Sequence, residues 1–192
     1  KKILFNDKFC LTEAVLSGTK TMTRRILKEG TPLGNWEETA KHLPYKVGEV
    51  VAIAQSYNDI YNELEEQGDD VSNDWWIPSF EGKVLDTLAG YKNKMFVRSD
   101  LMKHHIKITD VKVEYLQNIS DDEILREGIY PQRFFNKEEY VFATKGKLNN
   151  TPVHWLKTFP TPREAFASLI DKISGKGTWE SNPWVVAYSF EL

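Results

Sequence analysis

The stretch IKITDVKVEYLQNISDDEILREGI, at residues 106–129, has the clearest structural pattern in the chain. Apolar side chains alternate along its first half, at Ile106, Ile108, Val111, Val113 and Tyr115. This period of two is typical of a strand, and its phase changes at Thr109 and Asp110, which predicts a bulge. We therefore expect a long, bent strand over residues 104–116.

The second half of the same stretch predicts a short helix. Ser120 and Glu123 have the spacing of a capping box, and Gly128 follows as a stop signal. A longer helix is expected near the C-terminus, with Pro162 at its first position and Gly175 after its last turn. Both helices are short enough to flank a sheet.

In the rest of the chain, the residue pattern mainly predicts β-strands. Strands are expected at residues 3–5, 21–27, 49–53 and 184–190, and a helix after the first strand is expected to end at Gly18. Residues 58–90 and 130–161 have no steady period, so we interpret both as insertions or long loops, the first with one short helix near 61–67. The absence of a regular βαβ rhythm predicts a single α+β domain over residues 1–192, mostly β, built as a small mixed sheet or partly closed barrel.

The composition excludes several classes of protein. Of the 192 residues 41% are hydrophobic and 28% are charged, which is typical of a globular domain and unlike a collagen, a coiled coil or a disordered chain. The single cysteine, Cys10, excludes a disulfide framework, and the four scattered histidines lack metal-ligand spacing. No apolar run approaches the ~20 residues that span a bilayer. We expect a cytoplasmic protein without a metal, a cofactor or a membrane partner.

Charge is distributed unevenly, although it sums to only −3. Residues 1–30 carry seven basic and three acidic side chains, and residues 91–113 carry six and two, so each stretch has a net charge of +4. Residues 58–86 carry nine acidic side chains and one lysine. If the two basic stretches lie together in the fold, they predict an anion-binding face. If they do not, their charged side chains are an ordinary solvated surface. The net charge argues against tight, nonspecific binding to duplex nucleic acid.

The segment GTKTMTRR, at residues 18–25, places a lysine, hydroxyl groups and arginines where a helix ends and a strand begins. Taken alone, this spacing has low specificity. In a regular strand, residues three apart face opposite sides. Lys20 can therefore meet Thr23 only from the turn after Gly18, before the pleat of the strand begins.

Four separated stretches give this segment its context: VLSGTKTMTRR, YKVGEVVAIAQSY, IKITDVKVEYLQNISDDEILREGI and AFASLIDKISGKGTWESNPWVVAYSFEL. In this order they resemble the ASCH-domain family, in particular its phage and prophage members, across residues 3–57, 91–129 and 162–192. The resemblance implies a PUA-like mixed β-barrel with short flanking helices that binds RNA or a modified nucleotide. It also implies a ligand cleft at the 18–25 turn, with Gly18, Arg24 and Arg25 as binding residues.

One branch of the ASCH family consists of small amidohydrolases that deacetylate N4-acetylcytidine. They use a lysine, a threonine three residues later and a distant glutamate, and the resemblance places these roles on Lys20, Thr23 and Glu127. A lysine with a lowered pKa would take the proton of the threonine hydroxyl, and the glutamate would protonate the leaving amine. The chain departs from the phage pattern at residues 54–57, where AQSY stands in place of an Arg-Glu pair before an aromatic residue.

Each candidate residue also has an ordinary structural explanation. Lys20 is then a surface lysine, Glu127 the end of a helix, and Trp75 and Trp76 pack the acidic insertion instead of stacking on a base. Three functions stay open at this point: an RNA- or nucleotide-binding domain, an amidohydrolase acting on an acylated nucleoside, and a non-catalytic protein-interaction module that uses the acidic insertion.

Overall fold

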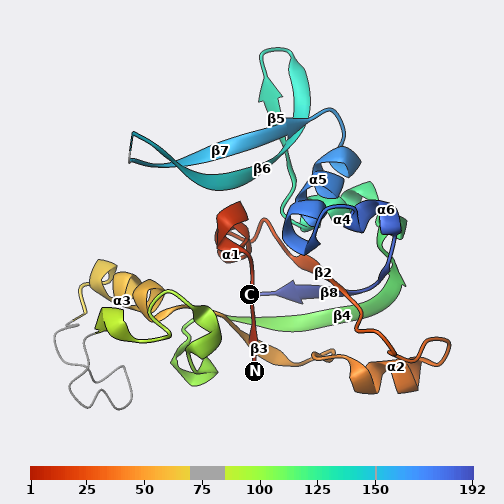
Figure 1. Ribbon diagram of the computed structural model, residues 1–192, viewed down its shortest axis with the longest axis horizontal. Helices are drawn as coiled ribbons and strands as arrows, with labels where there is room; N and C mark the ends of the chain where they lie inside the picture. The colour runs from red at the N-terminus through yellow and green to blue at the C-terminus, as the bar shows by residue number, and fades with distance from the viewer. Residues whose placement is uncertain (70–84, 150) are drawn as a thin grey trace. The chain divides into compact units, whose positions relative to one another are not determined.

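The computed structural model describes residues 1–69, 85–149 and 151–192. Its elements group into two compact units: unit 1 contains Lys1–Phe5 and Val50–Ile106, and unit 2 contains Asn6–Glu49 and Lys107–Leu192 (Figure 1). The strands of the described ranges form two sheets, and neither closes into a barrel. The expected mixture of strands and helices is confirmed, and the expected barrel is not. None of the helices in these ranges is long and apolar enough to cross a membrane.

Three antiparallel strands form the part of the first sheet that positions the candidate site. β8 (Trp184–Glu191) lies between β2 (Met22–Ile26) and β4 (His105–Tyr115), of which all but the first two residues belong to unit 2. The register between β4 and β8 shifts between Ile108 and Asp110. The bulge predicted from the change of phase is therefore confirmed.

Short helices make up much of the rest of unit 2. They are η1 (Asp7–Phe9), α1 (Leu11–Leu16), α2 (Trp36–His42), η6 (Leu116–Asn118), α4 (Asp121–Arg126), α5 (Pro162–Ser174) and α6 (Thr178–Ser181). The predicted capping box is confirmed, because the side chains of Ser120 and Glu123 each accept a hydrogen bond from the backbone N–H of the other. α2 was missed, since Thr39 is its one buried residue and its sequence has no apolar period.

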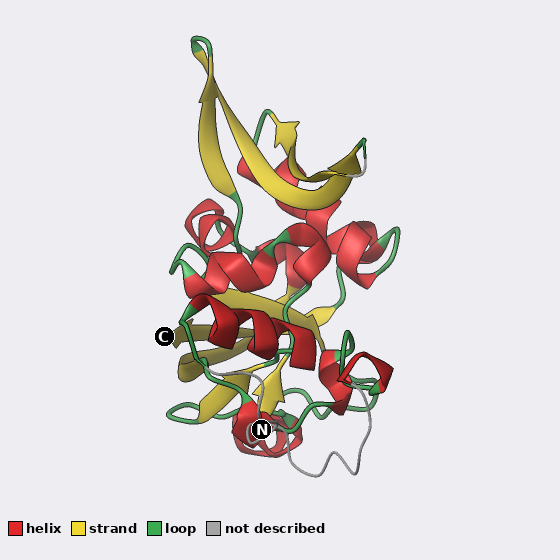
Figure 2. Ribbon diagram, turned by 90° about the vertical axis from the view of Figure 1, so that its left-hand side faces the viewer, coloured by secondary structure: helices red, strands yellow, loops and turns green. Residues whose placement is uncertain are grey.

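A second sheet occupies residues 130–159, where the sequence predicted an insertion without regular structure. β6 (Lys137–Leu148) lies between β5 (Tyr130–Phe134) and β7 (Thr151–Phe159), and both pairings are antiparallel. Its strands were missed because their only buried residues, Val141 and Phe142, are adjacent and hide the period of two. Figure 2 shows helices between this sheet and the strands β2, β8 and β4, and Figure 1 identifies α1, α4, α5 and α6 among them, whereas α2 lies beyond the strands.

Unit 1 has its own small core. β1 (Lys2–Ile3) pairs in parallel with β3 (Val50–Ile53), and the helix expected near residues 61–67 is present as α3 (Tyr57–Glu66), followed by η3 (Leu85–Thr87), η4 (Lys94–Phe96) and η5 (Ser99–Leu101). The core consists of Ala52, Ala54, Ile60, Leu64, Val97 and Met102. Trp75 and Trp76 lie outside the described residues, so their packing stays a prediction.

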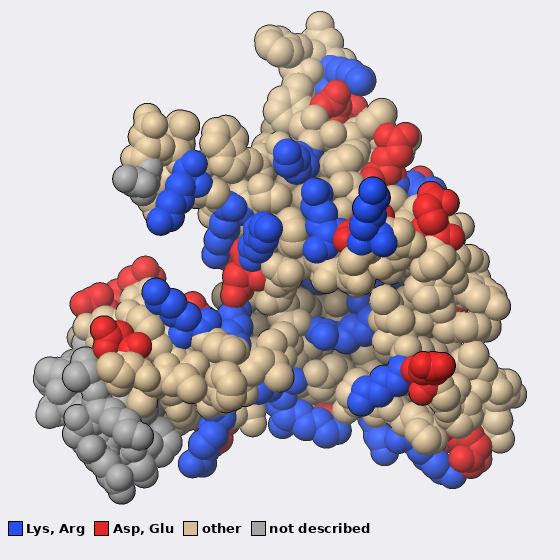
Figure 3. Space-filling model, in the orientation of Figure 1, with Lys and Arg blue, Asp and Glu red and all other residues tan. Residues whose placement is uncertain are grey.

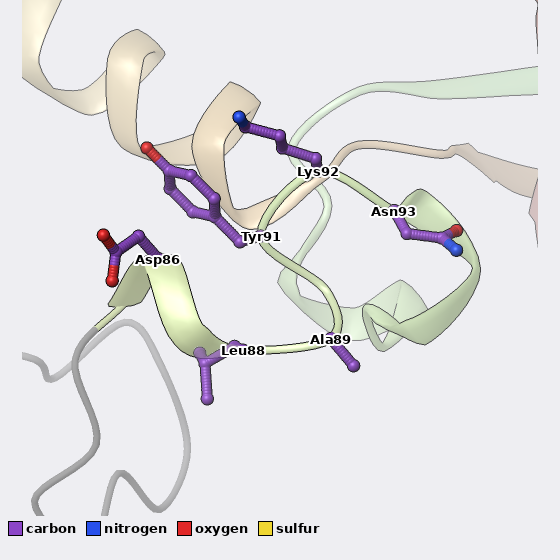
Figure 4. A pocket seen from close by; sticks show the side chains of 6 residues that line it. All are labelled: Asp86, Leu88, Ala89, Tyr91, Lys92 and Asn93. Carbon is purple, nitrogen blue, oxygen red and sulfur yellow. The ribbon is translucent and has the colours of Figure 1, made fainter.

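A cavity of about 450 Å³ opens along the loop from η3 to η4 in unit 1. Its lining consists of Asp86, Leu88, Ala89, Tyr91, Lys92 and Asn93. Figure 4 shows Asp86 and Tyr91 on one side of this loop and Leu88 and Ala89 on the other. None of the residues predicted to form the site belongs to this cavity.

Candidate functional site

The predicted site residues lie where α1 ends and β2 begins, except Glu127, which is the C-cap of α4. Gly18 has a φ of +75°, the left-handed conformation that ends α1 as predicted. The backbone N–H of Lys20 then donates to the carbonyl of Ala14 at 2.8 Å, and the N–H of Thr21 donates to the carbonyl of Arg126 at 2.9 Å. The turn is therefore fixed to α1 on one side and to the end of α4 on the other.

Lys20 is buried, with 2% of its surface exposed. Its Nζ donates to the carbonyl of Met22 at 2.7 Å, to the carbonyl of Glu127 at 2.8 Å and to Oε2 of Glu127 at 2.7 Å. Burial lowers the pKa of Lys20, and the carboxylate of Glu127 acts in the opposite direction. Lys20 and Glu127, to which the resemblance gave roles in one site, are therefore in direct contact. Because an ammonium group has three donors, none is left for a ligand in this geometry.

Gly128 provides the space in which Lys20 is buried. A Cβ at this position would lie 3.3 Å from Cδ2 of Leu11 and 3.6 Å from Cδ of Lys20. The backbone of Gly128 also has a φ of +96°, which an L side chain rarely adopts. The sequence identified this glycine only as a helix stop, and the structure adds its contact with the lysine stem.

The side chain of Arg24 is fully buried, with 0% of its surface exposed. Its five N–H groups donate as follows: Nε to Glu114 at 3.1 Å, Nη1 to Met22 Sδ at 3.1 Å and Glu127 at 3.0 Å, and Nη2 to Glu114 at 2.7 Å and Glu123 at 2.6 Å. Burial opposes the charge of Arg24, but Glu127 and Glu114 outweigh this effect and raise its pKa. Contrary to the expectation from the resemblance, no donor of Arg24 is left for a phosphate.

These residues form a balanced group, here called the charge cluster, of three cations and three carboxylates: Lys20, Arg24, Lys112, Glu114, Glu123 and Glu127. Nζ of Lys112 completes it at 2.5 Å from Glu123 and 3.2 Å from Glu114. The members come from the turn before β2, from β2 itself, from β4 and from α4 with its C-cap. Removing one partner from such a buried group leaves an uncompensated charge. The charge cluster therefore fastens α4 to the sheet.

Thr23 does not join this cluster. Lys20 stands on the turn before β2, as the contact with Thr23 required, but Thr23 lies on the opposite face of the strand from Arg24, with Tyr188 as its cross-strand neighbour. Within the described ranges, no hydrogen bond connects Thr23 with Lys20. Arg25 shares the face of Thr23, is half-buried, and contributes to the lowered pKa of Lys20 through its charge. The structure thus forms the lysine–glutamate contact and leaves out the predicted threonine.

A second group of polar residues lies on the β6–β7 hairpin. Residues 144–158 contain three lysines, Lys145, Lys147 and Lys157, and no acidic residue. All three are exposed, and Lys145 forms an ion pair with Glu13 of α1. Lys147 and Lys157 have no acidic partner in the part of the chain that the structure describes. Figure 3, in which lysine and arginine are blue, shows basic side chains along this hairpin, whose residues 144–149 and 151–158 we call the hairpin surface. In the β6–β7 register, Lys145 and Lys147 lie on one face of the hairpin and Lys157 on the other.

Comparison with models of known protein families, with curated proteins and with solved structures finds no match for this chain. In the described ranges, no three His, Cys, Asp or Glu side chains are placed to hold a metal ion. Two groups of residues therefore remain as candidates for function: the buried charge cluster and the exposed hairpin surface.

Proposed function

We propose that the protein is an RNA-binding domain of the ASCH type that holds its ligand on the hairpin surface of unit 2. One observation carries this proposal: a hairpin segment of fifteen residues has three lysines and no acid, in a chain whose net charge is −3. RNA is a polyanion, and lysines that lack an internal partner are free to neutralise its phosphates. The charge cluster then serves the fold and not the ligand.

The contrast between the two groups of cations supports this assignment. Lys20 and Arg24 donate every N–H to the protein itself, so binding a phosphate would require breaking existing ion pairs. Lys147 and Lys157 are exposed, and within the described residues they would break no ion pair on binding. Binding of a phosphate is therefore more favourable at the hairpin surface than at the turn of residues 18–25.

The experiment is fluorescence anisotropy of a labelled, unstructured RNA strand over a range of salt concentrations. About two phosphate contacts to a single strand, from Lys147 and Lys157, predict a slope of log K against log salt near −1.4. The variant Lys147→Gln/Lys157→Gln removes both and is expected to weaken binding and to bring the slope close to zero. Lys172→Gln, an exposed lysine on α5, is the matched control and is expected to leave both unchanged. An affinity for RNA that changes neither with salt concentration nor in the double variant would refute the proposal.

Deacetylation of an N4-acetylcytidine-type nucleoside is the second candidate function. It is favoured by the buried contact between Lys20 and Glu127, at 2.7 Å, together with the lowered pKa of Lys20. The threonine that the resemblance assigned as nucleophile does not lie beside Lys20, because Thr23 is on the other face of β2. Incubation with N4-acetylcytidine, followed by chromatography for cytidine, tests it directly. Turnover that is lost in Lys20→Met would support this function, and no cytidine from the wild-type protein would exclude it for this substrate.

A further inference from the structure

Trp155 occupies an unusual place on the hairpin surface. It pairs with Thr144 across the β6–β7 ladder, and Gly146 lies diagonally beside it. A Cβ built at Gly146 would lie 2.6 Å from Nε1 and 2.7 Å from Cδ1 of the Trp155 indole. Gly146 has no left-handed φ, so the backbone does not require glycine here. The edge of the indole occupies the space that a Cβ would fill, so a side chain at residue 146 would displace the ring.

Nearly half of this side chain remains accessible, since Trp155 is 47% exposed. The contact with Gly146 is made by the Nε1–Cδ1 edge of the indole and not by a face of the ring. The sheet packs its other aromatics more completely. Phe142 is fully buried and stacks on Phe159, with 5.7 Å between the ring centroids. An exposed indole whose edge is seated against the backbone of a neighbouring strand can serve as a stacking platform.

Charge around this platform favours a nucleotide. Lys157 follows Trp155 by two residues on β7, so both side chains project from the same face with Cα atoms about 6.6 Å apart. β7 is an edge strand of its sheet, which leaves the approach along this strand open. A base stacked on the indole would place its phosphate within reach of the Lys157 ammonium group.

We infer that Trp155, whose indole edge lies against Gly146, is the base-stacking platform that makes the hairpin surface select unpaired bases. This inference rests on the proposed function and identifies its ligand as single-stranded nucleic acid. The bases of a duplex are stacked on one another and paired, and freeing one costs energy that a single strand does not spend. Stacking on an aromatic side chain tolerates any base, because every base has a π-face.

The test compares Trp155→Leu, Trp155→Phe and Gly146→Ala with the wild-type protein in binding to a single-stranded RNA and to a hairpin duplex of the same length. Trp155→Leu is expected to weaken single-strand binding about tenfold, and Trp155→Phe to retain it within a few-fold because a ring remains. Gly146→Ala should behave like Trp155→Leu, since a Cβ displaces the indole. Trp36→Leu, a 51% exposed tryptophan on α2, is the matched control and should bind like the wild type.

Two readouts separate the stacking from the charge. The slope of log K against log salt should stay unchanged in Trp155→Leu, because its lysines are intact, and duplex affinity should not move. A strand of the same charge that carries abasic sites should bind the wild-type protein about as weakly as RNA binds Trp155→Leu. If Trp155→Leu binds like the wild type while Lys147→Gln/Lys157→Gln weakens binding, the platform is refuted and the proposed function stands. If the wild-type protein binds no RNA, the proposed function fails.

Discussion

Replacing Arg24 by methionine should destabilise unit 2 more than any exposed substitution. The change removes five hydrogen bonds at once and leaves two cations, Lys20 and Lys112, to balance three buried or partly buried carboxylates. Methionine has a similar length and no charge, so the loss of apolar contact is small. The main effect is therefore the uncompensated carboxylate charge.

The magnitude follows from how well the remaining charges are compensated. Breaking a buried ion pair by removing one partner costs about 3–5 kcal/mol. Glu114 and Glu123 are 13% and 18% exposed, so water and Lys112 compensate part of their charge, whereas Glu127 is 5% exposed and keeps only Lys20. We expect the lower half of the range, about 3–4 kcal/mol. At about 2–4 °C per kcal/mol for a chain of this length, the melting temperature should fall by about 6–16 °C.

Thermal and urea unfolding followed by circular dichroism measure this loss. Arg133→Met is the matched control, because Arg133 is exposed on β5 and should cost at most about 0.5 kcal/mol. A melting temperature of Arg24→Met equal to that of Arg133→Met would refute the argument that the charge cluster fastens α4 to the sheet. The same result would reopen the assignment of Arg24 to ligand binding.

Three further predictions concern the same region. Lys20→Met and Glu127→Gln should be non-additive in urea unfolding, with a coupling of about 0.5–3 kcal/mol, and strict additivity would show that the two side chains do not interact. Gly128→Ala should lower the free energy of unfolding by about 1–3 kcal/mol. Gly30→Ala is the control and should cost less, because the φ of Gly30 is also positive but a Cβ there would meet nothing within 4 Å. Equal losses in the two variants would exclude the contact with Lys20. Burial acts to raise the pKa of Glu123, but its hydrogen bond with Lys112 and the charge of Arg24 outweigh this effect and hold the pKa below its usual value of 4.5. Its contribution to stability is therefore present above about pH 4.5 and lost as the pH falls through the lowered pKa. The urea midpoint of Glu123→Gln should fall less steeply with decreasing pH than that of the wild-type protein. Equal pH dependence of the two midpoints would contradict this.

Local signals in the sequence predicted much of the fold around the charge cluster. The bulge in β4, the capping box of α4 and the stop of α1 at Gly18 each depend on neighbouring residues alone, and all three are present. Strand alternation also contained a signal that the resemblance overrode: Met22 and Arg24 share one face of β2, and Thr23 lies on the other. Applied strictly, this alternation predicts that Arg24, and not Thr23, accompanies Lys20.

The remaining features depend on contacts between distant residues. The partners Glu114 and Glu123 are 90 and 99 positions from Arg24, and no local pattern relates them to it. The sheet of β5, β6 and β7 escaped prediction because only Val141 and Phe142 of its residues are buried. The close approach of Trp155 to Gly146 likewise follows from the register of the β6–β7 ladder. The two asparagines at residues 149–150 indicate a turn, but they do not determine that register.

Mapping the RNA contact on the chain tests the account most directly. A single-stranded RNA that carries photoreactive uridines is cross-linked to the wild-type protein, and the modified peptides are identified by mass spectrometry. Cross-links are expected on the hairpin surface, at residues 144–149 and 151–158, with Trp155 among the modified residues and none at residues 18–25. Cross-links that concentrate at residues 18–25 and spare the hairpin would contradict it.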